Sequence, residues 1–219
     1  MNYPTDIEIY GRHTSYNVQK VLWLADELGL AYSHKEVGGR FGGNDTAEFL
    51  AMNPSGKVPV LRDKQRIILE SNTIIRYLAG QYSDEHWISS DPYERSQTDR
   101  WMDWSIDRLE KAFVGVFWGY YRTPPESRNQ AAIDASVSEC ESCLELLSNQ
   151  LANQHYVVGD HPSVADVATG IFQHRLNAID LAISMPDNIN QWYERLSERP
   201  GYRRWVMSDF SELQGRVGY

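Results

Sequence analysis

The first third of the chain alternates between strand-like and helix-like patterns. Residues 7–10 alternate apolar and polar side chains with the period of two that a half-buried strand requires. The next apolar residues follow helical spacing until Gly29, where a helix is expected to end, and residues 31–37 indicate a second strand. Because a helix separates the two strands, we expect them to run parallel.

A hairpin and another helix complete this region. Residues 58–61 and 66–69 form two short apolar runs separated by the polar residues 62–65, which predicts a β-hairpin. Ile74, Ile75 and Leu78 then share one side of a predicted helix. The order is βαβ followed by ββα, so we expect a small α/β domain.

Strand patterns stop beyond residue 92. Apolar residues recur at spacings of four and three over residues 102–116 and 133–151, which predicts two long helices separated at Pro124-Pro125. Ser163 is a predicted N-cap with Asp166 in the first turn, and a short helix around residues 188–197 ends before Pro200. We expect an all-helical domain here.

A polar stretch lies between the two patterns and ends in a helix-start proline, Pro92. We therefore expect a first domain at residues 1–83, a linker at 84–91 and a helical domain at 92–219. A chain of 219 residues is long enough for two such domains.

Charge and composition exclude several classes of function. With 21 Lys+Arg against 30 Asp+Glu, the formal charge is −9, so we expect neither a nucleic-acid nor a membrane partner. There is no apolar run of 18 residues and no leader pattern, which favours a cytoplasmic protein. Cys140 and Cys143 have CxxC spacing but fall inside a predicted amphipathic helix, so packing is favoured over metal binding; we expect no metal.

Two short motifs indicate a binding site in the first domain. Pro59 cannot donate to a β-ladder, so it marks a bend where the backbone of Val58 is left to bond something else. Glu70-Ser71 opens the helix after the hairpin, and the free N–H groups of a helix start suit a carboxylate. Each motif alone is weak evidence.

In this order, the motifs resemble the glutathione transferase superfamily, and the resemblance covers essentially the whole chain. It includes the residues 53–61, 70–71, 101–104 and 163–166. Bacterial theta-like members look most similar, through residues 11–21, 38–45 and 122–126. The resemblance implies a thioredoxin-like N-terminal domain followed by an all-helical C-terminal domain.

The resemblance also implies how glutathione, as co-substrate, binds. Val58 pairs through its backbone with the cysteinyl part, ahead of a cis Pro59. Glu70 binds the ammonium and Ser71 the carboxylate of the γ-glutamyl end. Lys57 faces the glycine carboxylate in this interpretation; the alternative is a solvated loop lysine.

Catalysis in this family requires a glutathione thiolate. Lowering a thiol pKa of 8.5 by two units takes about 2.7 kcal/mol of preferential stabilisation, which a hydroxyl hydrogen bond and a helix N-terminus can supply together. In theta-like relatives a serine at the start of the first helix donates this bond, which corresponds to Ser15. Thr14, Asn17 and Tyr10 are the alternatives.

The second substrate is expected against the helical domain. The candidate electrophile-site residues near the end of its first helix are Phe113, Phe117, Trp118, Tyr121 and Arg122. The aromatic residues can equally be core. Arg122 would favour an electrophile that carries a carboxylate or develops negative charge.

We therefore predict a glutathione transferase that conjugates small electrophiles or displaces halide, with a role in detoxification. The resemblance implies a homodimer with Asp99 and Arg100 at the subunit contact, where they could reach the partner's glutathione. Two alternatives stay open. One is glutathione-dependent peroxide reduction, and the other is a non-catalytic glutathione-binding or regulatory module on the same scaffold.

Overall fold

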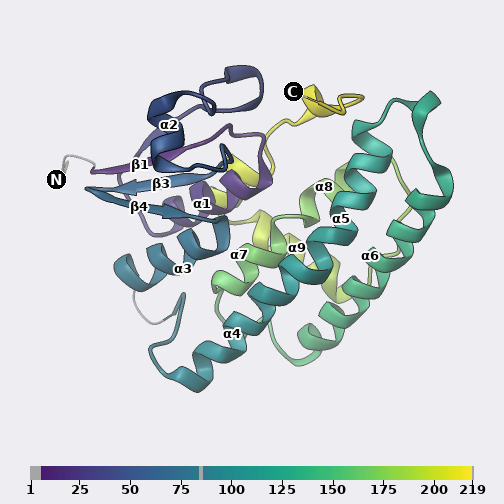
Figure 1. The fold of residues 1–219 in the computed structure, drawn as a ribbon. Helices are drawn as coiled ribbons and strands as arrows, with labels where there is room; N and C mark the ends of the chain where they lie inside the picture. Colours follow the sequence, from purple (N-terminus) through teal and green to yellow (C-terminus); the bar gives the residue numbers. More distant parts are fainter. Residues whose placement is uncertain (1–5, 84–85, 219) are drawn as a thin grey trace. The chain divides into compact units, whose positions relative to one another are not determined.

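The computed structural model describes residues 6–83 and 86–218, which form two compact units (Figure 1). The first unit spans Met1–Ile88 and Pro200–Ser208, and the second spans Ser89–Arg199 and Asp209–Tyr219. Residues 84 and 85 of the expected linker lie outside the described residues, as do residues 1–5 and 219 of the expected domains. The expected domain boundaries stay a prediction.

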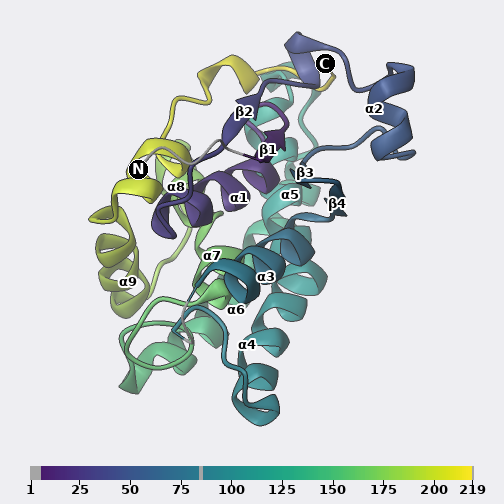
Figure 2. The ribbon, with the colours of Figure 1, turned by 90° about the vertical axis from the view of Figure 1, so that its left-hand side faces the viewer.

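A four-stranded mixed sheet organises the first unit, in the order β2-β1-β3-β4 (Figure 2). The strands are β1 (Ile7–Tyr10), β2 (Ser33–Lys35), β3 (Val60–Asp63) and β4 (Arg66–Leu69). β1 pairs parallel with β2 and antiparallel with β3, and β3 forms the hairpin with β4. The predicted βαβ–ββα order and the parallel pair are confirmed.

Three helices accompany this sheet. Figure 1 shows α1 (Tyr16–Glu27) and α3 (Ser71–Tyr82) on one face and α2 (Ala47–Met52) on the other. α1 and α3 bury the apolar sides that their spacing predicts. The fully buried residues include Val18, Val21, Leu22, Ile74, Ile75 and Leu78.

The structure corrects three local expectations. β2 covers three residues rather than 31–37, and β3 begins at Val60 rather than at Val58. The hairpin turn is also tighter than predicted, because Arg62 pairs with Ile67 and extends the strand into the polar stretch. α2 was not predicted: it buries a single side chain, Phe49, so its six residues have no apolar periodicity.

The second unit is helical, as predicted. α4 (Pro92–Trp104) is capped by Asp91, which accepts the backbone N–H groups of Tyr93 and Glu94. It continues through π-helical residues 105–109 into α5 (Glu110–Val116) and ends in a second π-helical stretch, Phe117–Arg122. α6 (Gln130–Gln150) packs beside α5 (Figure 1).

A buried carboxylate holds the rest of this unit together. Ser163 caps α7 (Val164–Gly170) in a capping box with Asp166. Asp166 is completely buried and accepts hydrogen bonds from the Val157 N–H at 2.9 Å and the Trp192 Nε1–H at 3.0 Å. It thereby joins α7 to α9 (Asp187–Ser197), with the short α8 (Gln173–Ala178) between them in the chain.

A segment near the C-terminus belongs to the first unit, which the sequence pattern did not predict. Tyr202 lies edge-to-face on Trp23 of α1, with ring centroids 4.8 Å apart. The Trp205 indole N–H donates to Asp26 Oδ2 at 2.8 Å. Gly201 allows this close contact, because a Cβ there would lie 3.0 Å from the Trp23 carbonyl oxygen and would crowd it.

Candidate functional site

The loop after β1 carries the predicted thiol-activating residues. Gly11 has φ +145°, and a Cβ there would lie 2.5 Å from Val18 and 2.9 Å from Val58, so only glycine fits without displacing them. The Ser15 N–H donates to the Arg12 carbonyl oxygen at 3.1 Å and closes a turn. This turn delivers the chain into the first residue of α1.

Ser15 is the N-cap residue of α1, but its side chain makes no capping hydrogen bond. Its carbonyl oxygen accepts the Gln19 N–H at 2.9 Å, and the side chain is partly exposed. The hydroxyl is thus not used by the helix backbone. By contrast, the alternative Thr14 is buried, at 1% exposure.

Tyr10, another alternative, donates its hydroxyl to Glu8 Oε2 at 2.6 Å. Burial, followed by this hydrogen bond to Glu8, raises the pKa of Tyr10 to about 12. A phenol with a raised pKa keeps its proton at neutral pH, and this proton is directed at Glu8.

The loop before β3 presents the backbone of Val58. The Val58–Pro59 peptide bond is cis. Among the described residues, no hydrogen bond involves the backbone amide or carbonyl of Val58. Asn53 fixes the loop by donating from Nδ2 to the Lys57 carbonyl oxygen at 2.8 Å, while the Lys57 side chain is exposed.

The start of α3 carries the other predicted binding residues. Glu70 adopts φ +65° and is exposed, without capping the helix through its side chain. Ser71 donates its hydroxyl to Asn17 Oδ1 at 2.9 Å. The backbone N–H groups of this first turn have no acceptor within the helix, so they favour an anion.

These segments are neighbours within the first unit. Gly11 brings the loop after β1 against Val58, and the Ser71–Asn17 bond joins the starts of α3 and α1. The structure therefore brings together Ser15, Asn17, Val58 and Ser71 from three separate parts of the sequence. The N-termini of α1 and α3 can bind negative charge, and the Val58 backbone can pair with an extended chain. Together they can bind a small anionic peptide.

Sequence reasoning missed two side chains of this region. Three side chains pack closely around Gly38. A Cβ placed on this residue would lie 3.7 Å from Arg12 Nη1, 3.8 Å from Val58 Cγ1 and 3.9 Å from Asn44 Cγ. Arg12 thus lies on the same glycine as the Val58 side chain. His13, beside it, pairs with Glu36. Both lie in the loop that contains Ser15, and the partner of His13 is 23 residues away in the chain.

The predicted electrophile residues divide into buried and accessible ones. Phe113 and Phe117 are buried and stacked, with centroids 5.3 Å apart. Tyr121 stacks on Phe117 at 5.2 Å and lies across Phe210 at 5.2 Å, and it is partly exposed. Burial, and then the charge of Asp209, raises the pKa of Tyr121, so it is a neutral phenol at neutral pH.

Arg122 and Trp118 form a pair at the end of the same helix. The Arg122 guanidinium lies 3.8 Å from the Trp118 ring centroid and donates through Nε to the Arg216 carbonyl oxygen at 2.7 Å. Arg122 is 2% exposed, whereas Trp118 is 36% exposed. Arg122 therefore lies behind an accessible indole rather than presenting its own charge to solvent.

Asp99 and Arg100 lie on α4, in the second unit. Asp99 pairs with Arg95 at 3.6 Å, and Arg100 donates to Gln150 Oε1 of α6 at 3.3 Å. Arg100 is exposed. Their predicted approach to a partner subunit stays a prediction.

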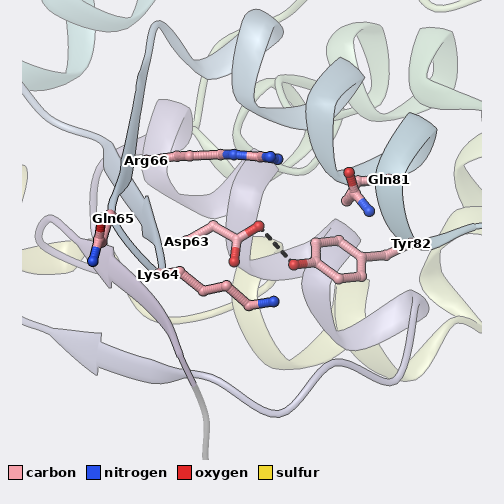
Figure 3. Close-up of a pocket in the computed structure, with 6 residues that line it drawn as sticks. All are labelled: Asp63, Lys64, Gln65, Arg66, Gln81 and Tyr82. Atoms are coloured by element: carbon pink, nitrogen blue, oxygen red, sulfur yellow. Dashed lines mark hydrogen bonds between the residues drawn. The ribbon is translucent and has the colours of Figure 1, made fainter.

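A pocket of about 540 Å³ lies elsewhere in the first unit and contains none of the predicted site residues (Figure 3). Its lining residues are Asp63, Lys64, Gln65, Arg66, Gln81 and Tyr82. Asp63 accepts the hydroxyl groups of Tyr82 and Tyr77 on Oδ2, at 2.6 and 2.5 Å. These bonds tie the hairpin to the end of α3, which is a structural role.

The remaining chemistry of the described residues is limited. Cys140 and Cys143 are buried free thiols, and burial raises the pKa of Cys140 to about 12. In residues 6–83 and 86–218, no cluster of three or more His, Cys, Asp or Glu side chains has metal-site geometry. No described helix combines the length and apolarity needed to span a membrane.

Comparison with known proteins shows the family to which the chain belongs. Residues 9–86 match the family model of the glutathione S-transferase N-terminal domain, and residues 110–200 match that of the C-terminal domain. Glutathione S-transferase GstB of Escherichia coli is 45% identical over 204 residues, which is 92% of this chain and 98% of the relative. Glutathione S-transferase 4 of Zea mays is 27% identical, over 89% of each chain.

A solved structure is similar over nearly its whole length. The theta class glutathione S-transferase of Xanthomonas axonopodis pv. citri, with glutathione bound, superposes with a TM-score of 0.89 at 40% identity. The match covers 94% of this chain and 99% of that chain. The chain belongs to the glutathione S-transferase family.

Proposed function

We propose that the chain binds glutathione in its first unit and activates the thiol as a thiolate that attacks a small electrophile. The observation that carries this proposal is the Ser15 hydroxyl, which lies at the N-terminus of α1, is partly exposed and caps no backbone group. A hydroxyl in this position can donate to a sulfur instead. The bound glutathione of the theta class relative supports the same ligand.

The energy that activation requires is available from these groups. A shift of two pKa units needs about 2.7 kcal/mol. A hydrogen bond to a charged group contributes about 1.5–3 kcal/mol, and a helix N-terminus about 0.3–1 kcal/mol. Ser15 and the start of α1 together therefore suffice. Asn17 stays the alternative, because Ser71 occupies its Oδ1 and leaves the amide N–H groups as donors.

Glutathione lies along three contacts in this proposal. Its γ-glutamyl end binds at the start of α3, with Glu70 on the ammonium and Ser71 on the carboxylate. Its cysteinyl part pairs with the free backbone of Val58, ahead of Pro59. Lys57 is the proposed cation for the glycine carboxylate, and Arg12, whose guanidinium lies near Gly38, is a second candidate.

The electrophile is held by the aromatic residues of the second unit. Tyr121 and Trp118 are the accessible members, and they are supported from behind by Phe113 and Phe117. Arg122 adds positive charge beneath Trp118, which favours an electrophile that is anionic or develops negative charge. The reaction is conjugation or halide displacement, since both are nucleophilic substitutions by one thiolate.

We also propose that the protein is a homodimer with the Asp99 and Arg100 region of α4 at the subunit contact. Sedimentation of the intact protein measures the mass in solution. We expect the Arg100→Glu variant to be monomeric. The matched variant Arg108→Glu, which lies further along the same helix, is expected to remain dimeric. A monomeric wild-type protein contradicts the proposed dimer.

Retention on immobilised glutathione, followed by turnover of a substrate panel, tests the function. The panel contains aryl halides, small halo-acids and hydroperoxides. Retention with turnover of a halide or halo-acid supports the transferase. Absence of retention contradicts glutathione binding. Retention without any turnover favours a binding module, and turnover of hydroperoxides alone favours a peroxidase.

A further inference from the structure

His13 and Glu36 form a two-point pair beside Ser15. Glu36 Oε2 accepts the backbone N–H of His13 at 3.1 Å, and Glu36 Oε1 lies 2.5 Å from His13 Nδ1. The carboxylate therefore holds both the loop and the imidazole ring. The two side chains are 28% and 30% exposed, so the ring is fixed but still accessible.

This contact decides which ring nitrogen can accept a proton. A carboxylate only accepts hydrogen bonds, so Nδ1 must carry the hydrogen that points at Glu36. The lone pair is then on Nε2, at the opposite side of the ring. Phe41 packs edge-to-face on the imidazole, with centroids 6.2 Å apart, and Arg40 lies over the Phe41 ring. Glu36 is the charged group in direct contact with the ring.

The pair lies in the same turn as the proposed thiol-activating residue. The Ser15 N–H to Arg12 carbonyl bond closes a four-residue turn, with His13 at its second position and Ser15 at its fourth. The loop after β2 that supplies Glu36 also approaches Val58, through Gly38. A ligand thiol bound between Val58 and Ser15 is therefore bordered by this loop and this turn.

Thiolate formation needs an acceptor for the thiol proton. The Ser15 hydroxyl can hydrogen-bond to the sulfur, but a neutral hydroxyl is too weak a base to take up the thiol proton. We propose that His13, oriented by Glu36, accepts that proton; this inference rests on the proposed thiolate activation. The S–H bond breaks, its electron pair stays on sulfur, and the proton binds Nε2. The resulting imidazolium then releases the proton to solvent.

Stopped-flow mixing of the intact protein with saturating glutathione, without electrophile, tests the inference. The ultraviolet absorbance of the thiolate gives a rate constant and an amplitude. A general base typically contributes at least a hundredfold in rate, so His13→Gln is expected to slow thiolate formation by about tenfold or more. The amplitude stays near that of the wild type, because Ser15 still stabilises the thiolate. Added imidazole restores the rate in His13→Gln far more than in the wild type.

Three matched variants complete the experiment. Glu36→Gln slows thiolate formation, whereas Glu48→Gln, an exposed glutamate on α2, does not. His86→Gln, at an exposed histidine of the same unit, also keeps the wild-type rate. A wild-type rate in His13→Gln, or equal rescue by imidazole in both proteins, overturns the inference while leaving the proposed function intact. If the wild-type protein forms no thiolate, the result contradicts both this inference and the proposed thiolate activation.

Discussion

The Ser71 hydroxyl donates a hydrogen bond to Asn17 Oδ1 at 2.9 Å and so joins the first turn of α3 to the first turn of α1. Both helices begin at the same place and direct their N–H groups there. Two residues 54 positions apart in the chain thus align the helix ends that the proposed glutathione site uses.

This link predicts different effects for its two partners. Ser71→Ala is expected to lower glutathione affinity about tenfold or more, because in the proposed complex the ligand carboxylate replaces Asn17 Oδ1 as the acceptor of the Ser71 hydroxyl, and a hydrogen bond to a charged group is worth about 1.5–3 kcal/mol. Asn17→Ala lowers it less, since it removes only the partner that orients Ser71. Calorimetric titration measures the glutathione affinity of both variants, and Ser83→Ala at the other end of α3 is the control. Equal affinity of Ser71→Ala and wild type would contradict the assignment.

Ser15→Ala is expected to lower turnover at neutral pH more than it lowers glutathione binding. In the proposed mechanism the hydroxyl lowers the pKa of the bound thiol and α3 and Val58 supply most of the binding, so its loss is expected to shift the pH profile of kcat/KM for the electrophile to higher pH. Steady-state kinetics across pH measure this shift. Asn17→Ala keeps the wild-type profile if Ser15 is the donor. Full activity of Ser15→Ala with an unshifted profile would transfer the role to Asn17.

Tyr82→Phe is expected to reduce the free energy of unfolding by about 1–3 kcal/mol. Asp63 is 3% exposed, and the Tyr82 hydroxyl is one of its two phenol donors, at 2.6 Å. Removing this hydroxyl leaves the buried Asp63 carboxylate with one hydrogen-bond donor fewer. Urea unfolding measures the loss. Tyr93→Phe is the matched control, because Tyr93 is 69% exposed; an equal effect in both variants would remove Asp63 from the explanation.

His174 is expected to make the fold sensitive to acid. Burial, and then the neighbouring charge of Arg175, lowers the pKa of His174 below its ordinary value of 6.5. The unfolded chain therefore binds this proton more readily than the folded one. Stability is full above pH 6.5 and is lost as the pH falls from 6.5 through the lower folded-state pKa.

The test compares urea midpoints of wild type and His174→Gln at about pH 7.5 and about pH 5. The midpoint of the wild type falls more between these two conditions than that of the variant. Carboxylates that titrate in the same pH range are common to both proteins, so their contributions to the change in midpoint cancel in the comparison. A parallel fall in both would show that His174 does not contribute.

Arg122→Ala is expected to reduce the ratio of turnover for an anionic electrophile to turnover for a neutral one. The guanidinium lies 3.8 Å from the centroid of the accessible Trp118 ring, so in the proposed site its charge would attract an anionic electrophile bound on that ring. Arg122 also anchors the Arg216 carbonyl, so the variant loses stability too. The ratio separates the two effects, because unfolding lowers both turnovers equally. An unchanged ratio would leave Arg122 with the structural role alone.

The sequence determined the fold class and the identity of most candidate residues. Apolar periodicity is a local property, so the βαβ–ββα order and the two long helices could be predicted from spacing alone. The Val58-Pro59 and Glu70-Ser71 motifs could be found for the same reason, since each consists of adjacent residues. α2 escaped prediction because one buried residue, Phe49, makes no period.

Tertiary structure decided how those residues are used. The carbonyl partner of Arg122 and the carboxylate partner of His13 both come from residues far away in the sequence. Glu36 is 23 positions from His13, and Arg216 is 94 positions from Arg122. Spacing along the chain carries no information on such pairs, because they form only when packing brings separate elements into contact.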